Sequence, residues 1–305
     1  MKSKMMFLTL ALIAFAAFAL PIYAQADDDV RGAFLTTRPK ATDKTNNPAA
    51  NRTHRRPKAR PAPTPGPVSG GGTTSGASKK VLPRMGLGLT LFMRDSIGLA
   101  VRTDPKHAFR KGDHVRFLLE TNTDGYLYIF NTTDGGPPIM IYPDQELDEA
   151  GNYIQAHVPF EIPSSVAAEE RLRWLTFDQY PGAEKLYFVF TREPLAGAPI
   201  EDDLISFCRE NEGKCPWHPR AELWAQIQKE LSEPGQTSKT KGLGNSETAN
   251  EHKAVVRGIG LNRDDPEPSL IMLSASSSKT ILVTTLDLVH NAISLLDSES
   301  EEPPQ

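Results

Sequence analysis

The stretch from Gly112 to Asp144 constrains the fold most, because it contains three strand patterns separated by two turn patterns. In residues 113–120 apolar side chains alternate with polar ones, and in residues 125–130 the aromatic Tyr126, Tyr128 and Phe130 alternate with aliphatic side chains. A period of two is typical of strands that have one face in a core. The stretch therefore predicts antiparallel β structure and not a catalytic motif.

Similar short segments recur along the rest of the chain, each bounded by Pro, Gly, Asn or Asp, and this spacing is typical of a sandwich or barrel. Two helices are expected at 200–212 and 219–232, a mobile loop at 233–253, and returning strands at 254–290. The predicted fold class is therefore mainly β, with an antiparallel β-sandwich-like domain over 85–290 that carries a two-helix insertion. The further strands are expected at 86–95, 97–101, 139–142, 158–162, 173–177, 186–191, 255–261, 270–274 and 280–288.

The N-terminal residues predict export. Lys2 and Lys4 precede the apolar residues 5–20, and the small-residue pattern at 24–26 completes a signal peptide over 1–26. The apolar run is shorter than the roughly 20 residues that a transmembrane helix needs, and we expect no transmembrane segment after signal cleavage. The expected location is the periplasm or the exterior.

Residues 27–84 are predicted to form a disordered linker. From Pro39 to Pro83 the chain has eight prolines and few large apolar side chains, so this part cannot bury enough surface to offset its chain entropy. The net charge is +10 through Arg84 and −14 after it, and the chain ends in an acidic tail over 291–305.

A basic cluster in this linker is a candidate anion-binding site, and its alternative is a solvated linker that touches the acidic body. No aromatic side chains lie between its members, so base stacking is not available and nucleic acid is not an expected partner. A protein or a cell-envelope polymer is expected instead. The cluster consists of Arg52, Arg55, Arg56, Lys58 and Arg60.

The only two cysteines, Cys208 and Cys215, are expected to form a disulfide, because export places them in an oxidising compartment. A zinc site that adds His218 is the alternative, but the spacing of the cysteines is unusual and no fourth ligand is evident. An acidic loop that begins at Asp144 could offer oxygen ligands to calcium, yet Glu149 occupies the position where a calcium loop needs glycine. We therefore expect a solvated hairpin loop there, and neither a metal nor a cofactor.

A possible interaction face consists of Tyr126, Tyr128, Phe130 and Tyr142. Aromatic side chains at a period of two more often form a sandwich core than a ligand-stacking surface, so both interpretations stay open.

A family resemblance follows from the order and spacing of several short motifs over about residues 85–195. These are Gly112-Asp113, Val115-Arg116-Phe117, Asn122, Asp124 to Tyr128, Tyr142-Pro143, Ile162-Pro163 and Gly182-x-Glu184-x-Leu186. In these motifs the chain resembles the bacterial family named domain of unknown function 4384. The resemblance implies a β-rich, often exported domain with no assigned activity, and so it supplies no catalytic residues. The two helices and the long loop before Val255 depart from the short family pattern.

The expected function is that of a non-enzymatic interaction or envelope-associated module. The sequence contains neither the Gly-x-Ser-x-Gly nor the His-Glu-x-x-His motif. One alternative is an exported hydrolase whose site is assembled from distant residues. The other is a cell-wall tether that acts through the basic linker.

Overall fold

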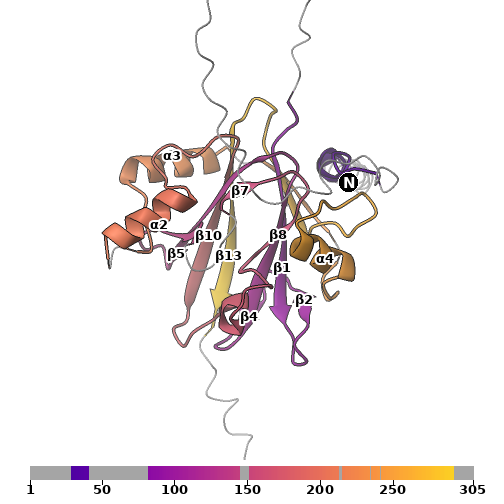
Figure 1. Ribbon diagram of the computed structural model, residues 1–305, viewed down its shortest axis with the longest axis horizontal. Coiled ribbons are helices and arrows are strands. Elements are labelled where there is room, and N and C mark those ends of the chain that lie inside the picture. The colour runs from indigo at the N-terminus through magenta and orange to yellow at the C-terminus, as the bar shows by residue number, and fades with distance from the viewer. Residues whose placement is uncertain are drawn as a thin grey trace, which may run out of the picture.

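The computed structural model describes residues 29–40, 82–144, 151–212, 215–233, 235–240 and 242–291. They form two facing β-sheets with helices on both outer sides (Figure 1). The predicted signal peptide, residues 27–28 and 41–81 of the predicted linker, and all but the first residue of the predicted acidic tail lie outside these residues. In the described part, no helix combines the length and the apolar character that crossing a membrane requires.

The first sheet contains seven of the described strands, all in antiparallel pairs. Its central path is β11 (Gln236–Lys239), β12 (Leu270–Leu273), β1 (Gly86–Arg94), β4 (His114–Thr121) and β8 (Phe160–Ile162); β2 (Ala100–Arg102) pairs with β1, and β9 (Leu175–Thr176) pairs with β4. The second sheet contains six described strands. Its path is β3 (Ala108–Phe109), β13 (Ile281–His290), β10 (Gly182–Thr191), β5 (Gly125–Thr133) and β6 (Ile139–Tyr142), with β7 (Tyr153–Ile154) paired to β5. Only the short β3 to β13 pair in this sheet is parallel.

The main core lies between the sheets and comes from the alternation that the sequence shows. Val115, Phe117 and Leu119 of β4 face Leu127 and Ile129 of β5 in one buried cluster. Phe188 and Phe190 of β10 complete it. The mainly β, two-sheet fold class is therefore confirmed, and β12 and β13 belong to the same two sheets as the earlier strands.

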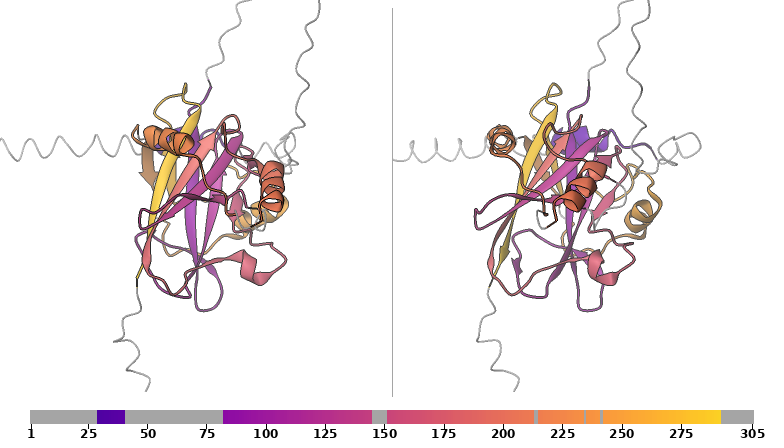
Figure 2. Two further views of the ribbon diagram at one scale, coloured as in Figure 1. Left: turned by 90° about the vertical axis from the view of Figure 1, so that its left-hand side faces the viewer. Right: turned by 60° about the vertical axis from the view of Figure 1, so that its left-hand side comes forward.

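Helices α2 (Glu201–Glu210) and α3 (Ala221–Leu231) confirm the predicted helical insertion. They lie in front of the second sheet when the molecule is turned as in Figure 2. Leu223 and Ile227 of α3 and Leu204 of α2 pack on the outward-facing Tyr128 and Phe130 of β5. A single 3-10 turn, Glu170–Arg173, precedes β9.

Two predictions for residues 233–261 are wrong. Residues 233–253, expected to form a mobile loop, contain β11 and the start of helix α4 (Ala249–Arg257), and Val255 lies in this helix instead of opening a strand. The reason is local: Thr248 and Glu251 form a reciprocal capping box, and Gly258 ends the helix with φ +58°. The apolar side chains at 255–261 predicted a strand, but the capping box and Gly258 determine a helix instead.

Residues 29–40, which we expected to belong to the disordered linker, pack against the body. A helical segment at 29–35 places Val30 and Phe34 on Ile271 and Leu273 of β12. Figure 1 shows this segment and α4 on the same side of the molecule. Val30 and Phe34 lie one helical turn apart, a spacing that favours a short helix with one apolar face. The composition of the long polar stretch that follows predicted a disordered linker instead.

Candidate functional site

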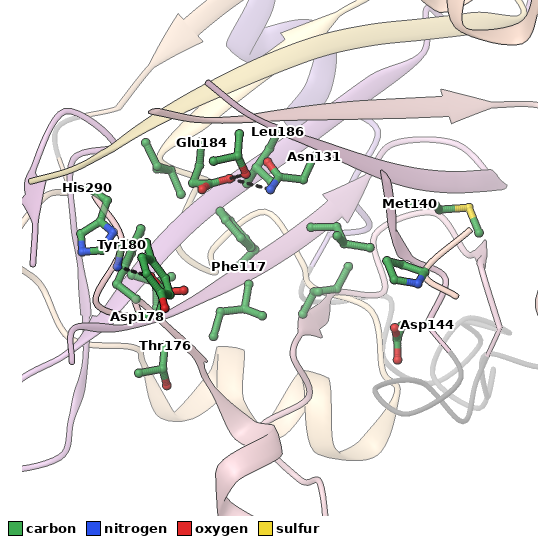
Figure 3. Close-up of a pocket in the computed structure, with 18 of the residues that line it drawn as sticks. Phe117, Asn131, Met140, Asp144, Thr176, Asp178, Tyr180, Glu184, Leu186 and His290 are labelled. Carbon is green, nitrogen blue, oxygen red and sulfur yellow. Dashed lines mark hydrogen bonds between the residues drawn. The ribbon is translucent and has the colours of Figure 1, made fainter. Parts of the chain in front are cut away.

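A pocket of about 790 Å³ opens where β5 ends and β10 begins (Figure 3). Its apolar walls come from both sheets: Val115 and Phe117 from β4, Leu186 from β10 and Leu288 from β13. These side chains also belong to the cluster between the sheets. The pocket therefore borders the sandwich core, and it also reaches Met140 and Leu204 of the cluster beneath α2 and α3.

The pocket forms because the inner-facing side chains change from apolar to polar toward one end of the strands. On β5 the inner series runs from Leu127 and Ile129 to Asn131 and Thr133. On β10, Glu184 occupies the next inner position after Leu186, and it pairs in register with Thr133. Short polar side chains at these positions leave space that large apolar ones would fill, so the two sheets are not packed together here.

Glu184 is fixed in the pocket wall by two hydrogen bonds from the neighbouring strand. Its Oε2 accepts one from Asn131 Nδ2 at 2.6 Å and one from Thr133 Oγ1 at 2.9 Å. Both donors line the pocket with Glu184. These bonds hold the carboxylate in one position, which is what a preformed recognition group requires.

Turns beside the strands supply the rest of the polar rim. Asp134 adopts φ +51°, and its Oδ1 accepts the Ala183 N–H at 2.8 Å. Asp178 Oδ1 accepts the Tyr180 N–H at 2.7 Å, and the Tyr180 side chain is 70% exposed. Figure 3 shows Asp178, Tyr180 and His290 together on one side of the pocket. These aspartates shape turns and also present carboxylates to the opening.

The disulfide between Cys208 and Cys215 lies on the opposite wall, and it confirms the predicted pairing. Trp217 follows Cys215 by two residues, and its carbonyl oxygen accepts the Met140 N–H of β6 at 2.8 Å. His218 Nδ1 contacts the Pro138 carbonyl oxygen at 3.0 Å. The alternative zinc site is wrong, because both sulfur atoms are bonded to each other and the imidazole bonds to the backbone.

A second polar cluster lies on the outer face of the first sheet, beneath the cover formed by α4 and residues 29–40. Arg38 is buried, and its Nε and Nη2 donate to the two carboxylate oxygens of Glu120 at 2.8 and 2.6 Å. His157 Nδ1 contacts Glu120 at 2.7 Å. Burial by itself raises the pKa of Glu120, but Arg38 and His157 outweigh it and hold this pKa below its ordinary value.

The same cover buries two further arginines of the first sheet. Arg102 of β2 pairs with Glu251 of α4. Arg116 of β4 lies 3.0 Å from Glu161 of β8 and 3.2 Å from Glu247. Burial, and then the charge of Glu161, raises the pKa of Glu247 to about 7. These ion pairs connect the first sheet to the segments that cover it, and we assign them a structural role.

The sequence-predicted aromatic face does not form a surface. Tyr128 and Phe130 are buried beneath α2 and α3, Tyr142 is buried between the sheets, and only Tyr126 is partly exposed. The Tyr128 hydroxyl accepts the Leu195 N–H at 3.1 Å. The interaction-face interpretation is therefore corrected: the helical insertion covers Tyr128 and Phe130, and Tyr142 belongs to the core between the sheets.

Two other candidates fall at least partly outside the described residues. The basic cluster of the linker lies wholly outside them, and so do residues 145–150 of the acidic loop considered for calcium. In the parts of the chain that the structure places, no group of three or more His, Cys, Asp or Glu side chains is arranged to hold a metal ion.

Residues 108–194 match the family described as Domain of unknown function (DUF4384). The match confirms the resemblance, and it includes the pocket residues of β4, β5, β6, β8, β9 and β10. The pocket residues in α2, those at 215–217 and those at the end of β13 lie beyond it. No curated protein and no solved structure matches the chain.

Proposed function

We propose that the body is an exported, non-enzymatic binding module, and that the pocket between its sheets takes up an apolar group of a small ligand. One observation carries this proposal: apolar walls of the pocket are side chains of the sandwich core itself, which border the cavity at one end of the sheets. A cavity of about 790 Å³ lies in the range of roughly 300 to 1,000 Å³ that small-molecule sites occupy. Apolar walls with a few fixed polar groups are typical of such sites.

The roles of the rim carboxylates also favour binding over catalysis. Glu184 accepts hydrogen bonds from side chains of the neighbouring strand, and Asp134 and Asp178 accept backbone N–H groups of turns. A general base or nucleophile needs a partner that shifts or activates it. The bonds of these three carboxylates instead fix their positions.

Export is supported by the N-terminal charge and hydropathy pattern and by the disulfide of Cys208 and Cys215. We propose a periplasmic or secreted protein. A binding protein in that location meets ligands of the envelope or of the medium.

Filling the pocket tests the proposal. Leu175 of β9 is a partly exposed lining residue, so Leu175→Trp should occupy space without opening the core. The uncharged probe N-phenyl-1-naphthylamine should fluoresce on binding the wild type, and its affinity should fall at least about tenfold in the variant. This corresponds to about 55 Å² of lost apolar contact.

Val166→Trp is the matched control, because Val166 is 55% exposed and does not line the pocket. It should bind the probe as the wild type does. Equal affinity of wild type and Leu175→Trp would place the probe elsewhere and reject the pocket as the binding site.

A further inference from the structure

We propose that the open edge of β13 is an interaction surface for one extended segment of a partner protein, which carries an acidic side chain on the face turned toward the first sheet. The added segment becomes a further strand of the second sheet. This surface is separate from the pocket, because none of residues 281–287 lines the pocket. The inference therefore does not depend on the proposed function.

One edge of β13 has no strand beside it over most of its length. On one side, β13 pairs with β10 over all ten of its residues. On the other side, only Val289 and His290 pair with β3. In the described part of the chain, residues 281–287 therefore have a free edge, and Figure 2 shows β13, in yellow, at the margin of the second sheet.

The backbone groups of alternate residues point to this edge. On the β10 side, the Arg192 N–H donates to the Thr280 oxygen at 3.1 Å. On the β3 side, the Asn291 N–H donates to the Phe109 oxygen at 2.8 Å. Because these directions alternate along a strand, even-numbered residues bond to β10 and odd-numbered ones face the edge. The N–H and C=O groups directed to the free edge are those of Ile281, Val283, Thr285 and Asp287.

This edge also lacks the features that keep exposed strands from pairing. Edge strands of native proteins are commonly short, or they carry prolines, bulges or charges. The strands at the other margins of the two sheets, β3, β6, β8 and β11, have two to four residues, whereas β13 has ten. Residues 281–287 contain no proline, and their one charge, Asp287, pairs with Lys185 of β10 at 3.4 Å. Such an edge is suited to accept another strand.

The first sheet extends past β13 on this side. Thr237 of β11 pairs in register with Met272 of β12, whose side chain belongs to the core between the sheets. Residues paired in this way share a face, so Thr237 and, two residues later, Lys239 lie on the inner face of β11. Both are nevertheless exposed. Among the described strands, none of the second sheet covers them, and a strand added beside β13 would lie opposite β11.

This position of β11 favours a single segment over a second copy of the chain. Two β13 strands paired about a twofold axis would bring two complete sandwiches together. The β11 strands of both copies would then extend over the same junction, where each would meet the first sheet of the other copy. An extended segment of a partner protein adds one strand only and avoids this overlap.

Lys239 determines the charge that the segment needs. Lys185 and Lys279 have carboxylate partners, whereas Lys239 has none in the part of the chain that the structure places. Because Asp287 is paired with Lys185, the edge offers no unpaired carboxylate to a basic segment. The remaining charge is positive, and it favours Asp or Glu at the position of the segment that faces Lys239.

Labelled peptides test this inference. Each has seven residues in which valine alternates with threonine, and the central threonine is replaced by glutamate in one peptide and by lysine in the other. Titration of the full chain, followed by fluorescence anisotropy, should show binding of the glutamate peptide about threefold tighter than that of the lysine peptide, as expected for one exposed ion pair.

A methylated peptide separates backbone pairing from side-chain contact. N-methyl groups on two adjacent central residues of the glutamate peptide block both of its edges while its charge stays the same. The affinity should fall at least about tenfold, because N–H groups that pair with β13 are lost. Equal affinities of the methylated and unmethylated peptides would overturn the inference, and so would the absence of binding by every peptide.

Two substitutions locate the binding. Lys239→Glu, at an exposed side chain, should reverse the preference, so that the lysine peptide binds more tightly than the glutamate peptide. Thr285→Pro removes an N–H directed to the edge and none that bonds to β10, and it should lower the affinity for the glutamate peptide about tenfold. Thr285→Val keeps this N–H and should bind as the wild type does. An unchanged preference in Lys239→Glu, or an unchanged affinity in a folded Thr285→Pro variant, would overturn the assignment.

Sedimentation of the full chain tests the other occupant. A chain that stays monomeric at high micromolar concentration agrees with an edge that is open to a partner segment. A dimer that Thr285→Pro dissociates would place a second copy on β13 and reject the partner segment.

Discussion

Replacing Arg38 with methionine should lower the free energy of unfolding by about 3 to 5 kcal/mol, the largest effect we expect from a single substitution in this chain. The side chain is buried and donates to both oxygens of Glu120 and to the carbonyls of Asp265 and Pro266 at 3.0 Å. Methionine fills similar space but leaves a buried carboxylate without its cation. Urea unfolding at pH 7, followed by circular dichroism, measures the change.

The matched control is Arg31→Met in the same N-terminal segment. Arg31 pairs with Glu267 at 2.6 Å, but both side chains are about one-third exposed, at 36% and 32%. Such a pair contributes only about 0 to 1 kcal/mol. If the two variants lose the same stability, burial of the Arg38 pair does not determine its effect.

A double-mutant cycle with Glu120→Gln isolates the pair itself. Removing the charge of Glu120 should cost less when Arg38 is already methionine, because the uncompensated carboxylate disappears. The variant Arg38→Met should also regain stability at acid pH, where Glu120 becomes protonated. Additive effects of the two substitutions would contradict an ion pair that joins residues 29–40 to the body.

The sequence predicted the sheets because two kinds of side chain alternate along strands such as β4 and β5. Val115, Phe117 and Leu119 cannot all be buried unless β4 is a strand with this face inward. The helical insertion was predictable from Leu223 and Ile227, which lie one helical turn apart on α3. Local periodicity is thus sufficient to predict a helix or strand when one of its faces packs against a core.

The cover of the first sheet was not predictable in the same way. Arg116 and Glu120 alternate with the apolar side chains of β4, and this pattern is typical of a solvated outer face. They are instead buried by Arg38 and Glu247, from segments more than 80 residues away in either direction. The sequence around a charged side chain does not indicate whether a distant residue of opposite charge will cover it.

The pocket could be predicted only in part. The inner series of β5 ends in Asn131 and Thr133, and that of β10 reaches Glu184, so the change to polar inner positions is visible once both strands and their register are known. The register depends on pairing between segments more than 50 residues apart. The aromatic side chains of β5 were considered as an interaction face instead, although Tyr128 and Phe130 form the core beneath α2 and α3.

The second large effect that we expect is a pH dependence that Glu247→Gln removes. Burial and the charge of Glu161 raise the pKa of Glu247 from 4.5 to about 7. The folded protein therefore binds a proton more tightly than the unfolded chain does, and Glu247 contributes stability that is present below pH 4.5 and lost as the pH rises through 7. Such a shift corresponds to about 3 kcal/mol for a fully buried group, and access to water reduces it to about 2 kcal/mol.

Glutamine resembles the protonated acid and cannot ionise. The variant should match the wild type at pH 4 and exceed its free energy of unfolding by about 2 kcal/mol at pH 8. The groups that face Glu247 are Arg116, Glu161, Glu251 and His252. His252 is 54% exposed and 3.5 Å from Glu247, so the comparison is repeated with His252→Gln, which should leave the difference in place.

Glu170→Gln is the control for the loss of a surface carboxylate, since Glu170 is 71% exposed beside Arg94. Its stability should follow that of the wild type at every pH. A constant difference between wild type and Glu247→Gln from pH 5 to pH 8 would show that Glu247 stays ionised in the folded protein. In that case Arg116 alone neutralises both carboxylates, and the cover of the first sheet is insensitive to pH in this range.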